Sequence, residues 1–118
     1  MRIRIIFLTA VSALLLHTVV GWAWSPVAAI AGGYRAQSNG WAVGAIGVGM
    51  SWTGLVFFNL FAAPAQVLEM ARVVASITGG LPGWTVFLTS IIMGFLLGGL
   101  GGLLGQSMSE FKTKRNTN

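Results

Sequence analysis

The sequence predicts an all-α protein of the integral membrane class, a helical bundle in a single domain over residues 1–111. Of its 118 residues, 55% are hydrophobic and only 8% are charged, whereas soluble domains are about one quarter charged. Long uncharged runs are what a bilayer-spanning helix requires, and glycines gather in two of these runs. We expect three transmembrane helices, one short or re-entrant helix and one interfacial amphipathic helix.

The first transmembrane helix is predicted over residues 5–23. This run has 19 residues without a formal charge, and at about 1.5 Å per residue it is close to the thickness of the hydrocarbon core. A cleaved signal peptide is the alternative, since Arg2 and Arg4 precede the run and the small residues Gly21 and Ala23 end it. The run is long for that role, so we favour a retained span.

The second element is a short helix over residues 26–34. Trp22 and Trp24 are typical of a membrane interface, and Ser25 followed by proline is typical of an N-cap and a first helical turn. Only about 14 Å of apolar helix follows before Arg35. The segment is therefore either a short span supported by its neighbours or a half-helix that enters the membrane and returns.

Two further transmembrane helices are predicted over residues 41–63 and 84–107. The first run is uncharged, has 23 residues and ends before Pro64, which is long enough to cross with some tilt. The second is also free of charged residues. The polar segment that follows, residues 109–118, is expected to be frayed, and it includes a basic polar tail, residues 112–118.

Residues 65–78, between these two spans, have an amphipathic pattern. Gln66, Glu69, Arg72 and Ser76 share one face of a helix, and apolar residues cover the rest. Glu69 and Arg72 are three residues apart and are expected to form an ion pair. The pattern predicts a helix that lies in the membrane interface. An ordinary connecting helix packed on the end of the bundle is the alternative.

Small residues recur at steps of three and four in both long apolar runs. They are Gly40, Gly44, Gly47, Ser51 and Gly54 in one run, and Gly94, Gly98, Gly101, Gly102 and Gly105 in the other. In lipid, helices associate through close van der Waals contact, which small residues permit. We expect these two faces to pack on each other within one chain or on copies of themselves, with either hand of crossing.

Two polar residues, His17 and Asn59, lie inside predicted spans. An ionisable group in a span is a candidate functional residue. His17 shares a helix face with Ala10 and Ala13, so we expect a neutral imidazole that donates to a backbone carbonyl, with cofactor binding or proton transfer as the alternative. Asn59 is expected to form a hydrogen bond between helices. The sequence contains no metal-ligand cluster, nucleophile–base set or phosphate loop, so we expect no enzymatic activity, cofactor or metal.

The net charge of +5 comes from basic residues that flank the apolar runs. Nucleic-acid binding would need a basic face on a folded domain, so we expect the lipid bilayer as partner and no nucleic acid. With four membrane segments, Arg2, Arg4, Arg35 and the tail fall on the cytoplasmic side, as the positive-inside rule requires. We therefore predict a multi-pass protein of the cytoplasmic (inner) membrane with both termini in the cytoplasm. Three spans would place the termini on opposite sides.

Two resemblances bear on function. Trp24-Ser-Pro26, Arg35, the run Gly40–Asn59 and the string GFLLGGLGGLLG at residues 94–105, in that order, resemble a group of small multi-span bacterial membrane proteins. That group has no known activity, so the resemblance implies a class and no site. The string Ala13-Leu-Leu-Leu-His17 is similar to the alanine-to-histidine spacing of bacterial antenna polypeptides. There the histidine ligates a bacteriochlorophyll, which would imply a pigment at His17.

The leading functional hypothesis is a non-enzymatic accessory or scaffold subunit of a larger membrane complex, or a homo-oligomer, assembled through the glycine-rich faces. The alternative is an oligomeric channel or small transporter, in which the broken segment after Trp24 is a half-helix that lines a path. A pigment- or haem-binding membrane subunit, with His17 as the ligand, is the second alternative.

Overall fold

The computed structural model describes residues 2–116 and contains five α-helices and one 3-10 turn in that range. The elements are α1 (Arg2–Val19), η1 (Trp22–Trp24), α2 (Ser25–Ala36), α3 (Gly40–Ala62), α4 (Pro64–Ile77) and α5 (Trp84–Asn116). The prediction of an all-α protein is confirmed. The short second helix is present too, with the 12 residues of α2.

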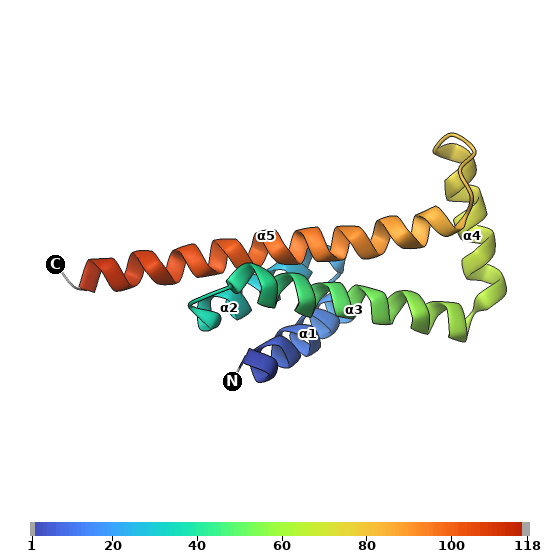
Figure 1. Cartoon of the computed structure of the whole chain (residues 1–118). Helices are drawn as coiled ribbons and strands as arrows, with labels where there is room; N and C mark the ends of the chain where they lie inside the picture. The colour runs from blue at the N-terminus through green and yellow to red at the C-terminus, as the bar shows by residue number, and fades with distance from the viewer. Residues whose placement is uncertain (1, 117–118) are drawn as a thin grey trace.

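The helices form an elongated bundle built on two long rods. Helices α3 and α5 lie side by side, and α4 connects them at one end of the molecule (Figure 1). Helices α1 and α2 pack against the opposite half, where α2 contacts both long helices and α1 contacts α2 and α3. Both chain ends lie toward the end of the bundle away from α4 (Figure 1). The molecule measures 58 × 27 × 22 Å along its principal axes.

Two helices of the described chain, α3 and α5, are long and apolar enough to cross a membrane. The expectation of three firm spans is not confirmed, because α1 ends at Val19 and its apolar part, Ile3–Val19, is shorter than a spanning helix of this kind. Helix α1 ends early because of Gly21, whose φ of 128° lies in a region that other residues rarely adopt. The chain therefore leaves the helix four residues before the predicted end at Ala23.

The other helix boundaries follow local signals in the sequence. Gln37 and Asn39 take left-handed φ values of 57° and 55° in the turn before α3, and proline starts α4 directly after α3 ends. Helix α5 continues beyond Ser107 to Asn116, so the expectation of a frayed tail is wrong for residues 109–116. A hydrogen bond of 2.9 Å from Gln106 Nε2 to Glu110 Oε1 supports this polar extension.

The interior of the bundle is made of small residues. The buried apolar residues are Ala13, Ala28, Ala29, Val43, Val48, Ala71 and Ala75. Large apolar side chains face outward instead, and Phe61 is 91% exposed. Small side chains inside bring the helix axes close together, and the large ones leave an outer surface that is mostly apolar.

Candidate functional site

The most extensive helix contact in the described chain joins α5 to α3, and glycines of both helices lie in it. A methyl group on Gly98 would overlap the carbonyl oxygen of Gly44 and would lie 2.8 Å from Val48 Cβ. A methyl group on Gly102 would overlap the carbonyl oxygen of Gly40 in the same way. Real Cβ atoms essentially never approach another atom within 3.0 Å, so the two backbones touch only because glycine occupies these positions.

A second row of glycines on α5 faces α2. A methyl group on Gly105 would overlap the carbonyl oxygen of Ile30 and lie 2.7 Å from the amide nitrogen of Tyr34. One on Gly101 would lie 2.9 Å from both Ala29 Cβ and the carbonyl oxygen of Pro26. The glycine side of α5 is thus covered by two helices of the same chain.

At the other end of this face, Gly94 packs against a tryptophan. A methyl group on Gly94 would lie 2.8 Å from Cβ of Trp52 in α3. The rows of small residues on α5 therefore contact α3 and α2 along the middle of the helix, from Gly94 to Gly105.

The sequence predicts that the small residues of α3 share one face, but in the structure they lie on two. Gly40 and Gly44 face α5, whereas Gly47 and Ser51 face α1. A methyl group on Gly47 would lie 2.8 Å from Thr9 Cγ2. The Ser51 hydroxyl donates to the carbonyl oxygen of Ala10 at 2.6 Å. Helix α3 is therefore packed on two sides, by α5 and by α1.

Gly54 was predicted as a packing residue, within the chain or between copies of it, and within the described chain it contacts no other helix. A methyl group at Gly54 would meet no atom within 4 Å. The reason is a groove between α1 and α3, which Gly54 lines together with Ser51. Gly54 is thus the one member of the predicted α3 row that no other helix of the described chain covers.

A threonine that the sequence pattern did not indicate lies where α1 meets α2 and α3. Thr9 of α1 is buried, and it contacts glycines of both neighbouring helices, Gly32 of α2 and Gly47 of α3. Its hydroxyl donates to the carbonyl oxygen of Ile5 at 2.8 Å, so the polar atom is satisfied inside α1. Thr9 and the buried Ala13 are four residues apart, a spacing that marks one helix face.

Gln106 of α5, which was not among the predicted site residues, caps the start of α3. The amide N–H of Gly40 donates to Gln106 Oε1 at 2.8 Å. Gly40 is the first residue of α3, where backbone N–H groups have no partner within the helix. Gln106 continues the row of residues spaced by four after Gly98 and Gly102. This spacing was the signal that could have identified it.

We expect Gln106→Leu to lower the free energy of unfolding by about 1–2 kcal/mol, because the partly buried amide of Gly40 would lose its acceptor. Ser107→Leu is the matched control, since the exposed Ser107 hydroxyl bonds only within its own helix. Unfolding by titration with a denaturing detergent measures both variants. Equal stability of the two would contradict this assignment.

His17 connects the end of α1 to the start of α2. Its Nδ1 lies 3.3 Å from the hydroxyl oxygen of Ser25, and its ring packs edge-on against Trp52 with 5.4 Å between ring centroids. The expected partner was a backbone carbonyl, and the structure places a side-chain hydroxyl there instead. Ser25 is accordingly not the N-cap: Trp24 holds that position, without a side-chain cap bond.

The remaining predicted residues lie near α4. Asn59 is exposed and lines a pocket of about 370 Å³ with residues of α4 and α5. Among the hydrogen bonds of residues 2–116, none joins its side chain to another helix, so the expected interhelical bond is not formed. Glu69 and Arg72 form the expected pair, with 3.6 Å between Oε2 and Nη1, and both side chains are exposed. A solvated pair of this kind contributes little stability.

The fold and these interfaces define an all-α protein in which two helices could cross a membrane. Within residues 2–116, no three His, Cys, Asp or Glu residues come together as metal ligands. Comparison with protein-family models, curated proteins and solved structures gives no match.

Proposed function

We propose that this chain is a multi-pass protein of the cytoplasmic membrane that acts as a non-enzymatic accessory subunit of a larger membrane complex. Its glycine-packed helices form a rigid body, and the groove between α1 and α3 receives a transmembrane helix of the partner. The membrane location is supported by the two long apolar helices and by the large apolar side chains on the outer surface. Lipid solvates such a surface, whereas water does not.

The positions of the charges support an orientation. Arg4 of α1 and Arg35 of α2 line one pocket, and Lys112 of α5 lies beside the C-terminal end of α2, so these basic residues gather at one end of the bundle. The pair of Arg72 and Glu69 lies on α4 at the opposite end. Because basic residues favour the cytoplasmic side, both termini face the cytoplasm in this proposal.

A pair of topology reporters tests this orientation. A fluorescent protein fused after Asn118 should fluoresce, and alkaline phosphatase inserted at Gly80, next to α4, should be active. Gly80 is a suitable position because it is exposed in a turn after α4. An active phosphatase fused after Asn118 would overturn the proposed orientation.

The groove is the observation that carries the proposed function. Its volume is about 580 Å³, and its walls are almost entirely apolar side chains, among them Phe7, Val11, Leu14, Met50 and Phe58. Gly54 lies in it, free of any neighbour that a methyl group would touch. A glycine in an open apolar groove allows another helix to approach the backbone closely. The other glycines of the predicted α3 row already contact helices of this chain.

We expect Gly54→Leu to leave the fold intact and to abolish association with the partner. The added side chain enters the groove rather than an internal contact. Thr89→Leu, at an exposed position of α5, is the matched control. The tagged variants are purified from native membranes in mild detergent, and the partner is quantified relative to the tagged chain.

A photo-crosslinking amino acid at Phe58 identifies what occupies the groove, with the same group at Thr89 as control. The proposal predicts an adduct with a second membrane protein from Phe58 that Gly54→Leu removes. An adduct only with another copy of this chain, only with lipid, or one that is unaffected by Gly54→Leu would contradict it.

No structural observation favours the channel or the pigment hypothesis over this one. Helix α2, the candidate half-helix of a channel, has its glycine side covered by α1 and α5, through Gly32 and Gly33. His17, the candidate pigment ligand, has its Nδ1 beside the hydroxyl of Ser25. In the described chain, both features contribute to packing.

A further inference from the structure

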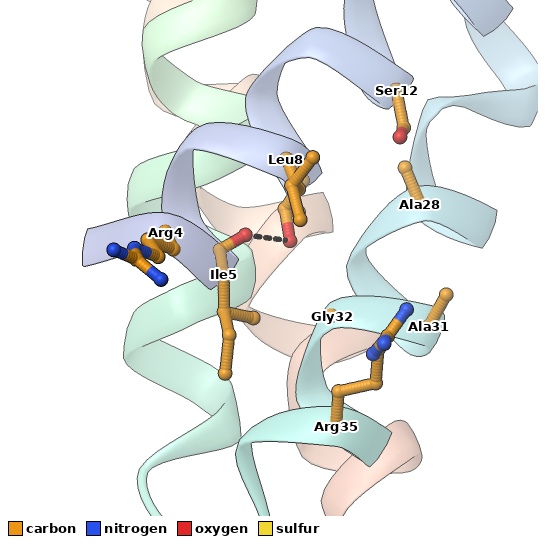
Figure 2. A pocket seen from close by; sticks show the side chains of 9 residues that line it. Arg4, Ile5, Leu8, Ser12, Ala28, Ala31, Gly32 and Arg35 are labelled. Carbon is orange, nitrogen blue, oxygen red and sulfur yellow. Dashed lines mark hydrogen bonds between the residues drawn. The ribbon is translucent and has the colours of Figure 1, made fainter. Parts of the chain in front are cut away.

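A pocket between α1 and α2 combines two arginines with an apolar wall. It has a volume of about 300 Å³ and lies toward the end of the bundle that holds the chain ends. Figure 2 shows Arg4 on the α1 side and Arg35 on the α2 side of this pocket, with Ile5 and Leu8 between them in this view. The Arg35 side chain runs back along α2 toward Ala31 (Figure 2).

The two arginines lack a negative partner in the described chain. Neither forms an ion pair within residues 2–116, and no described residue that lines the pocket is acidic. The chain has two acidic residues, and both are engaged elsewhere: Glu69 with Arg72 on α4, and Glu110 with Gln106 on α5. Two exposed guanidinium groups beside one pocket therefore leave a positive site that an anion complements.

The wall of the pocket determines which kind of anion fits. Ile5, Leu8, Ala28 and Ala31 give it an apolar lining next to the two charges. The hydroxyl of Thr9, which also lines the pocket, already donates to the carbonyl oxygen of Ile5 (dashed line in Figure 2). A free phosphate would leave the apolar wall unfilled. A phospholipid matches both parts, with its phosphate at the arginines and an acyl chain along the wall.

We propose that the pocket between α1 and α2 binds one anionic phospholipid through Arg4 and Arg35. The proposal rests on the membrane orientation given above, which places this end at the cytoplasmic leaflet, where anionic lipids give the surface its negative potential. Basic pockets between membrane helices on that side are suited to anionic headgroups. The bound lipid joins α1 to α2 beside the contact between Thr9 and Gly32.

The test is native mass spectrometry of the full chain in neutral detergent, titrated with phosphatidylglycerol or phosphatidylcholine. Loss of both arginines in Arg4→Gln/Arg35→Gln should weaken phosphatidylglycerol binding about 30-fold and leave phosphatidylcholine binding unchanged. Lys112→Gln/Arg115→Gln removes the same charge from the same end but outside the pocket. It should weaken phosphatidylglycerol binding less than about threefold. Equal loss in both double variants, or no loss in the first, would overturn the proposal.

Ala31→Trp tests the apolar wall with both arginines in place. Ala31 is exposed and lines the pocket, so the indole fills the space of the acyl chain and should weaken phosphatidylglycerol binding about tenfold. Glycerol phosphate, which has the headgroup but no chains, should not compete. Competition by glycerol phosphate, with Ala31→Trp binding as the unsubstituted chain does, would show a bare anion site and overturn the lipid assignment.

The outcomes separate this inference from the proposed function. If the α1–α3 groove captures a partner while phosphatidylglycerol shows no preference for the arginines, only the lipid site fails. If the lipid preference holds while Gly54→Leu changes no association, only the accessory-subunit proposal fails. Because Arg4, Arg35 and Ala31 are all exposed, we expect each variant to unfold at the same detergent fraction as the unsubstituted chain. This is measured before the binding experiments.

Discussion

Replacing Gly98 with alanine is expected to lower the free energy of unfolding by about 2 kcal/mol. The added methyl group would overlap the carbonyl oxygen of Gly44 and crowd Val48, and forcing extra atoms into a packed interior costs about 1–3 kcal/mol. The cost lies at the upper end here, because the obstacle is backbone that has no other rotamer. The better helix propensity of alanine offsets about 1 kcal/mol of it. Gly98→Leu should prevent α3 and α5 from docking at all.

The neighbouring residue provides a sharp control for this prediction. A methyl group on Gly99 would lie 3.6 Å from Ala45 Cβ and 3.9 Å from the carbonyl oxygen of Trp41, which are ordinary contacts. Gly99→Ala should therefore be neutral, or more stable by up to about 1 kcal/mol from helix propensity. Both variants are measured by titration with a denaturing detergent. Equal effects at Gly98 and Gly99 would mean that glycine content, rather than the contact with Gly44, sets the stability.

Gly105→Leu is expected to detach α2 from the bundle while α3 and α5 stay together. The new side chain would strike the backbone of α2 at Ile30 and Tyr34, whereas the contact of Gly98 with α3 lies two turns away along α5. We expect a loss of at least about 3 kcal/mol for the docking of α2. Amide hydrogen exchange resolves the effect, since exchange should accelerate over residues 25–36 and stay slow over residues 40–62.

Ser107→Leu adds the same side chain two residues later, on the exposed side of α5. It should leave hydrogen exchange in α2 unchanged. Slow exchange over α2 in Gly105→Leu, or exchange over α3 and α5 that is as fast as over α2, would contradict the assignment of Gly105 to the contact with α2.

The spacing of glycines predicted much of this architecture, because helix geometry fixes which residues share a face. On α5, the five predicted glycines, Gly94, Gly98, Gly101, Gly102 and Gly105, all lie at close contacts. On α3, the same reasoning assigned one face where the structure has two, with Gly44 toward α5 and Gly47 toward α1. Periodicity gives the angle of a residue around its own helix. It does not give the directions in which neighbouring helices lie, so it could not predict that no helix covers Gly54.

The first helix shows a different limit of sequence analysis. A glycine in an apolar run is compatible with a packing contact or with a helix end, and Gly21 ends α1 through its positive φ. The reversal of the chain after Gly21 brings Ser25 back to His17. The contact between Ser25 and His17 depends on this turn, so helical spacing could not predict it. The pocket of Arg4 and Arg35 has the same origin, since it forms only once α2 folds back along α1.

The glycine face of α5 is covered by α3 of the same chain, and a disulfide between the two helices would demonstrate this contact. A Cβ at Gly99 lies 3.6 Å from Ala45 Cβ, within the range of about 3.5–4.5 Å that a disulfide needs. The chain has no cysteine of its own, so Ala45→Cys/Gly99→Cys introduces a single pair, and Gly54→Cys/Gly99→Cys serves as the unlinked control. We expect rapid oxidation of the first pair to a linked monomer in dilute membranes. Linked dimers only, or oxidation no faster than in the control, would contradict it.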